Sequence, residues 1–170
     1  TTPRNTPVNV SGLTSGVTSI SGAAHTCAVT VSGGVKCWGY NAYGQLGDGS
    51  TTDRTTPVNV SGLGAGVTSI TAGNYHTCAI HNGAARCWGN NGYGQLGDGT
   101  TTNPRKTFVT VSGLGSGVTS ISAGQYHTCA VTASGGAKCW GNNNNGQIGD
   151  GTTTPRNTPV NVSGLTSGVT

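Results

Sequence analysis

The fold is decided by residues 78–99, which read CAIHNGAARCWGNNGYGQLGDG. Near the start of this stretch, Asn82-Gly83 separates two four-residue runs, the first beginning with Cys78 and the second ending with Cys87. This dipeptide is the preferred two-residue turn of a β-hairpin, because both of its positions must take φ > 0. The turn pairs Cys78 with Cys87 at a position where Cα atoms approach to about 4.5 Å, within disulfide reach. The stretch therefore predicts a hairpin with a disulfide between its strands.

The same pattern occurs three times along the chain. Its first Cys-Ala step lies at Cys27, Cys78 and Cys129, which are 51 residues apart. A Cys-Trp-Gly motif and a Gly-Gln-Leu/Ile-Gly-Asp-Gly motif follow each of them, and a fixed period of this length is typical of repeat architectures. Between these motifs lie short β-branched runs broken by Gly, Asn and Pro, and no stretch sustains a 3.6-residue period. The chain is therefore predicted to be all-β.

Each unit is expected to form four antiparallel strands, which makes the chain a tandem array of about three four-stranded units, or blades, with one disulfide per blade. In the middle unit the strands are predicted at residues 67–70, 76–81, 84–88 and 109–111. The expected divisions are residues 1–18 as an outer strand and linker, 19–68 as blade 1, 69–119 as blade 2 and 120–170 as blade 3.

Six cysteines allow fifteen pairings, and only pairing within each unit follows from hairpin geometry. The alternatives are buried free thiols, or a zinc site, which requires closer Cys/His clustering. Disulfides imply an oxidising compartment, so we expect an extracellular or cell-surface protein. The predicted pairs are Cys27–Cys37, Cys78–Cys87 and Cys129–Cys139.

Composition argues against several classes of function. Charged residues make up 7% of the chain, against about 25% in a typical soluble domain. The eight cations are scattered and only Arg105 and Lys106 are adjacent, so no nucleic-acid-binding stripe is predicted. No run of about 18 apolar residues is present, which argues against membrane insertion. Without paired carboxylates or an activated nucleophile, we expect neither an enzyme nor a cofactor.

The runs at residues 72–80 and 87–99 resemble the repeat of the regulator of chromosome condensation family. The resemblance covers essentially the whole chain, and it implies that the units are four-stranded blades of a β-propeller, about three in this chain and about seven in that family. Two cysteines per unit resemble the secreted, largely bacterial branch. The first unit departs from the pattern, because residues 21–25 are one residue short and lack the tyrosine. The family includes a nucleotide exchange factor, and four Asp and no Glu give no sign of the acidic surface that exchange requires.

Loops at one rim of a repeat array usually carry binding residues. In this chain such loops hold the candidate recognition residues Tyr43, Tyr75, Tyr93, Tyr126, Asn143 and Asn144.

Other repeated side chains have a structural explanation. The equivalent histidines either form a ring of imidazoles for a metal or ligand or, as we favour, lie buried against the backbone of a neighbouring blade. The aspartates of the Gly-Asp-Gly motifs fit turn residues better than calcium ligands, and the tryptophans fit packing between blades better than sugar platforms. We therefore expect no metal site. The histidines are His25, His76 and His127, and the tryptophans are Trp38, Trp88 and Trp140.

Residues 1–18 are identical to residues 153–170. Three blades cannot close a ring, and an open array exposes an apolar blade face at each end. The expected partners are a second copy or adjoining blades of the same array, which complete a ring of about six or seven blades or continue as a filament. We therefore expect a structural or assembly role. The alternatives are a secreted protein-binding propeller, such as an enzyme inhibitor, and a glycan-binding module.

Overall fold

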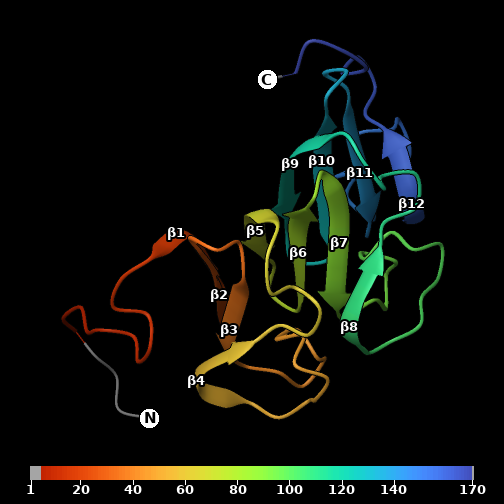
Figure 1. Ribbon diagram of the computed structural model, residues 1–170. Coiled ribbons are helices and arrows are strands. Elements are labelled where there is room, and N and C mark those ends of the chain that lie inside the picture. Colours follow the sequence, from red (N-terminus) through yellow and green to blue (C-terminus); the bar gives the residue numbers. More distant parts are fainter. Residues whose placement is uncertain (1–4, 170) are drawn as a thin grey trace.

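The computed structural model describes residues 5–169 and confirms an all-β chain of three four-stranded antiparallel sheets, each a blade (Figure 1). Blade 1 contains β1 (Val17–Gly22), β2 (His25–Thr30), β3 (Val35–Gly39) and β4 (Arg54–Asn59). Blade 2 contains β5 (Val67–Ala72), β6 (His76–His81), β7 (Ala84–Gly89) and β8 (Arg105–Thr110). Blade 3 contains β9 (Val118–Ala123), β10 (His127–Thr132), β11 (Ala137–Gly141) and β12 (Arg156–Asn161).

The central hairpin has the predicted register. Asn82 and Gly83 take φ values of 51° and 75°, and Cys78 faces Cys87 across β6 and β7. All three predicted disulfides are present, each with a Cα–Cα distance of 4.1 Å. The fourth strand of the middle unit differs from the prediction, because β8 begins at Arg105, which pairs with Gly89.

The three sheets cover residues 17–59, 67–110 and 118–161. Residues 5–16, expected to include a surplus outer strand, form turns and no strand. The equivalent strands β4 and β12 each pair with the third strand of their own blade, and within the described residues no third strand precedes β1. In Figure 1 this red segment lies apart from the sheets.

The apolar core lies between successive blades. Cys27, Val29 and Val35 of blade 1 belong to the same buried cluster as Ile70 and Trp88 of blade 2. The equivalent cluster joins blades 2 and 3, and Trp88 and Trp140 are fully buried, as predicted for packing between blades.

Candidate functional site

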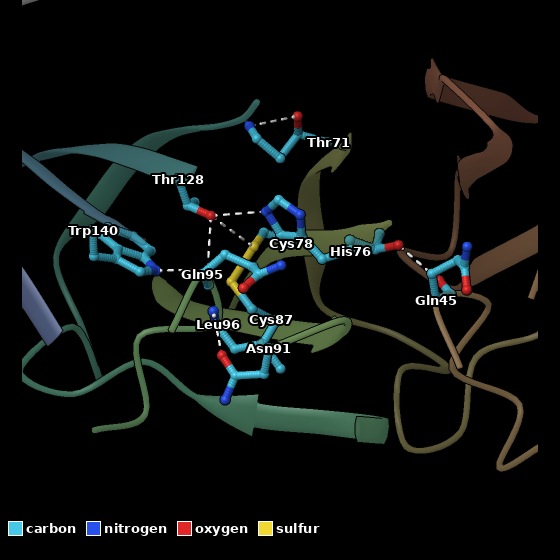
Figure 2. The surroundings of a disulfide bond; sticks show 12 residues. Gln45, Thr71, His76, Cys78, Cys87, Asn91, Gln95, Leu96, Thr128 and Trp140 are labelled. Carbon is cyan, nitrogen blue, oxygen red and sulfur yellow. Dashed lines mark hydrogen bonds between the residues drawn. A yellow bond between two sulfur atoms is a disulfide. The ribbon is translucent and has the colours of Figure 1, made fainter. Parts of the chain in front are cut away.

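Each contact between blades is fastened by one repeated set of hydrogen bonds, which we call the interblade latch. Between blades 2 and 3, the Gln95 carbonyl accepts hydrogen bonds from Thr128 Oγ1 at 2.8 Å and Trp140 Nε1 at 2.9 Å. The Nε2 atom of His76 lies 2.9 Å from the same Thr128 hydroxyl (Figure 2). The latch between blades 1 and 2 has the same geometry at 2.6–2.8 Å and consists of His25, Gln45, Thr77 and Trp88.

The latch determines which nitrogen of the imidazole ring carries the proton. Thr77 donates its one hydroxyl hydrogen to the Gln45 carbonyl, so it accepts from the Nε2–H of His25. The Nδ1 atoms of His25 and His76 are buried and have no hydrogen-bond partner among the described residues. Burial lowers the pKa of His25 to about 4 and that of His76 to about 3. Both rings are buried, as we favoured, but they bond a neighbouring hydroxyl rather than backbone.

The face that blade 1 turns away from blade 2 is open, and we call it the entry face. Its Ile20 is 62% exposed, whereas the equivalent Ile70 and Ile121 are 6% and 7% exposed. Trp38 is half-buried and lines an open pocket of about 330 Å³. The entry face therefore holds the Thr-and-Trp half of a latch, in Thr26 and Trp38, with no preceding blade among the described residues.

The opposite face, on blade 3, is also open, and we call it the exit face. Leu165 is 45% exposed, whereas the equivalent Leu63 and Leu114 are 0% and 2% exposed. His127 and Gln147 are half-buried and occupy the His and Gln positions of a latch. The two open faces thus carry complementary halves of the contact that the chain already builds twice.

The five tyrosines form one connected cluster, which includes all four predicted recognition tyrosines. Successive ring centroids lie 5.1–6.4 Å apart, and Tyr75 stacks on Tyr126 across blades 2 and 3. The rings are half-buried or exposed, and Tyr93 is 44% exposed. The tyrosine cluster runs in the order Tyr40, Tyr43, Tyr75, Tyr126 and Tyr93.

The two predicted asparagines differ in position. Asn144 is exposed, whereas Asn143 is fully buried and its side chain holds the loop together. Asn143 Oδ1 accepts from the Ile148 backbone N–H at 2.9 Å, and its Nδ2 donates to the Thr152 carbonyl at 2.9 Å. Asn143 therefore supports the loop.

A repeated Asp–Arg pair, which the sequence interpretation missed, closes the same loop in each blade. Asp150 Oδ1 accepts from the Thr152 backbone N–H at 3.0 Å, the turn role predicted for this residue. Its Oδ2 lies 2.7 Å from Arg156, and hydrogen bonds from Thr152 and Arg156 lower the pKa of Asp150 to about 2. An arginine six or seven residues after each Gly-Asp-Gly aspartate is the signal in the sequence. The other pairs are Asp48–Arg54 and Asp98–Arg105.

Two further observations apply to the described part of the chain. No three His, Cys, Asp or Glu side chains gather there in a group suited to hold a metal ion. Residues 5–169 also contain no helix that could cross a membrane.

Comparison with known proteins points to one family of repeats. The profile of the regulator of chromosome condensation (RCC1) repeat matches residues 32–80, 82–131 and 135–170. Over 144 residues the chain is 39% identical to the human probable E3 ubiquitin-protein ligase HERC4, covering 84% of this chain and 9% of that protein. It is 45% identical over 56 residues to the human E3 ubiquitin-protein ligase HERC2, covering 32% of this chain and 1% of that protein. The chain thus spans under a tenth of these relatives.

Solved structures share the fold. Human WBSCR16 superimposes with a TM-score of 0.74 at 24% identity, covering 86% of this chain and 39% of that one. Prp20p from Saccharomyces cerevisiae superimposes with a TM-score of 0.75 at 21% identity, covering 86% and 38%. At these sequence identities, the likeness shows the shared fold alone.

Proposed function

Because this chain belongs to the regulator of chromosome condensation (RCC1) repeat family, we propose that it is a non-enzymatic protein-interaction module with a structural or assembly role. Its two open faces join further blades, in a second copy or in the same array. The observation that carries this proposal is the 62% exposure of Ile20, against 6% and 7% for Ile70 and Ile121. Burying such a side chain contributes about 1.5–3 kcal/mol, so covering the entry face is favourable.

The faces fit one another head to tail. Seating the entry face on an exit face brings Thr26 and Trp38 to His127 and the Gln147 carbonyl, which completes a third latch of the kind seen at the two internal contacts. The same contact covers Leu165. Because the two surfaces differ, the association is heterologous and produces either a closed ring or a filament.

We assign this module to the extracellular space or the cell surface, within the secreted, disulfide-containing branch of the family. The support is one disulfide in every blade, since disulfides persist in oxidising compartments. The four cysteines of blades 1 and 2 are fully buried. Their burial gives these disulfides a structural role in the blade interior.

The test is the mass of the protein in solution, measured by multi-angle light scattering over a range of concentrations without reductant. We expect a mass that rises above one chain with concentration. Ile20→Asp should restore the single-chain mass. The control Val31→Asp should leave association intact, because Val31 is 76% exposed in the turn after β2, outside the buried cluster between the blades. A single-chain mass at every concentration would overturn the proposal.

A second candidate function, recognition of a protein or a glycan, is favoured by the continuity of the tyrosine cluster. Tyrosine offers a rigid apolar face and a polar tip, which suits both kinds of partner. A glycan array and a panel of candidate secreted enzymes provide the test. Binding that Tyr93→Ala weakens at least fivefold, and that Ile20→Asp leaves unchanged, would assign recognition to this cluster.

A further inference from the structure

The segment before blade 1 already has the backbone shape of a connection between blades. Leu13 N donates to the Val10 carbonyl at 3.1 Å, as Leu165 N donates to the Val162 carbonyl at 3.1 Å. The glycines of the two segments also match, with φ values of 72° and 71° at residues 12 and 16, and 75° and 74° at residues 164 and 168. Residues 5–16 are therefore shaped to lie on the hairpin of a preceding blade.

The later copy of this segment shows what such a hairpin provides. Ala137, at the start of β11, donates from its N–H to the Leu165 carbonyl at 2.7 Å and accepts from Val162 N at 3.1 Å. Further along, Lys138 of β11 faces Asn161 of β12, and its Nζ donates to Asn161 Oδ1 at 2.7 Å. Val35 of blade 1 and Ala85 of blade 2 make the equivalent backbone contacts with their own connections.

Residues 5–16 have no such hairpin among the described residues, although they are identical in sequence to residues 157–168. Val8 is 60% exposed, whereas the equivalent Val160 is half-buried beside Cys139 in β11. Both segments therefore fit the same site on a β10–β11 hairpin, and within the chain only residues 157–168 occupy it.

Joining the blades end to end forces these segments to compete. Residues 5–16 lead directly into β1, just as residues 111–117 lead from β8 into β9. A blade 1 seated on the exit face of another copy therefore brings its residues 5–16 to the β10–β11 hairpin, which residues 157–168 of that copy already cover. One place cannot hold both segments.

We propose that residues 5–16 of one copy take the place of residues 157–168 in a second copy, so that end-to-end joining proceeds by strand exchange. This inference rests on the proposed function. Within a separate chain residues 157–168 hold the place, because their covalent attachment gives them a high effective concentration. Docking of blade 1 tethers residues 5–16 at the same hairpin and removes that advantage. The incoming segment makes the same hydrogen bonds, since its sequence is the same.

The test is chemical cross-linking between two variants of the full chain. Exchange places Asn9 of one copy opposite Lys138 of the other, as Asn161 lies opposite Lys138 within blade 3. Mixing Lys138→Cys protein with Asn9→Cys protein and adding a short bismaleimide, which leaves disulfides intact, should give a covalent dimer on a non-reducing gel. The matched control replaces Asn9→Cys with Asn59→Cys, an exposed position that pairs with Lys36 in its own blade. We expect at least fivefold more dimer with Asn9→Cys.

A second substitution keeps the outcome decisive. Adding Val8→Asp to the Asn9→Cys protein should reduce the dimer to the control level, because the aspartate would enter the half-buried position of Val160. Equal cross-linking of Asn9→Cys and Asn59→Cys, with light scattering still showing association, would overturn strand exchange and leave end-to-end joining standing. A single-chain mass without cross-linking would overturn both.

Discussion

The imidazole Nε2 of His76 lies 2.9 Å from the Oγ1 of Thr128, a residue 52 positions further along the chain in the next blade. Thr128 donates its hydroxyl hydrogen to Gln95, so the ring must present Nε2–H. The ring's other nitrogen is buried with no hydrogen-bond partner among the described residues, and protonation there would place a charge in the core. The contact between blades 2 and 3 therefore requires neutral histidine.

The first prediction is a loss of stability in mild acid. Above pH 6.5, the ordinary pKa of histidine, these rings are neutral in both the folded and the unfolded chain. They therefore add no pH dependence to the free energy of unfolding there. Below pH 6.5 the unfolded chain binds protons, while the pKa of about 4 for His25 and about 3 for His76 keeps the folded rings neutral. The free energy of unfolding should therefore fall by about 1.4 kcal/mol per pH unit for each ring between pH 6.5 and about 4. Urea unfolding at several pH values measures this slope.

His76→Gln should flatten the slope by at most about half, because His25 and the half-buried His127 also have lowered pKa values. The control is Asn74→Gln at an exposed turn position, which removes no titratable group and should leave the slope unchanged. An unchanged slope in His76→Gln would refute the account.

The second prediction compares two equivalent threonines. Thr128→Val keeps the size of the side chain but leaves the buried Nε2–H of His76 without an acceptor, which should cost about 1–3 kcal/mol. The melting temperature should fall by roughly 2–4 °C for each kcal/mol. Thr26→Val is the matched control, because Thr26 has no preceding blade among the described residues. Calorimetry of the single-chain form at low concentration gives both values, and equal losses would contradict the role of the latch.

The third prediction concerns the loop that carries the latch carbonyl. Asn91 is fully buried, and its Oδ1 accepts from the Leu96 backbone N–H at 3.0 Å, next to Gln95. Asn91→Ala leaves that buried N–H unsatisfied and should lower the free energy of unfolding by about 1–3 kcal/mol. Asn74→Ala, at an exposed turn position, should change it by less than about 0.5 kcal/mol. Denaturant titration measures both, and a stable Asn91→Ala protein would show that the side chain does not support the loop.

Local chemistry explains why the blade interiors could be predicted from sequence. Asn82-Gly83 admits few turns, and that turn alone fixes the register that brings Cys78 to Cys87. The start of the fourth strand was harder to place, since β8 begins at Arg105 after a long loop and no turn sets its register.

The latches depend on contacts that no local pattern encodes. Thr128 and Trp140 meet a backbone carbonyl, that of Gln95, and a carbonyl carries no side-chain signature. Recurrence of Gln before Leu or Ile in all three loops was the available signal. The burial of Asn143 is hidden for a related reason, because an Asn-rich loop suggests solvent exposure whereas this side chain bonds the backbone of its own loop.

The fourth prediction follows from the open exit face. Cys129 is half-buried there, whereas Cys27, Cys37, Cys78 and Cys87 are fully buried. Reduction requires a thiolate to reach a sulfur atom, so the Cys129–Cys139 disulfide should be reduced first. Limited reduction followed by alkylation and peptide mass spectrometry should find blade 3 labelled at least fivefold faster than blades 1 and 2.

Association then changes this order in a defined way. A blade seated on the exit face covers Cys129 as blade 2 covers Cys27, so raising the protein concentration should slow labelling of blade 3 and leave blades 1 and 2 unaffected. Ile20→Asp should remove this protection, because the exit face then stays open at every concentration. Labelling of blade 3 that is as slow as that of blades 1 and 2 at the lowest concentration would show that the exit face is closed to solvent within a single chain.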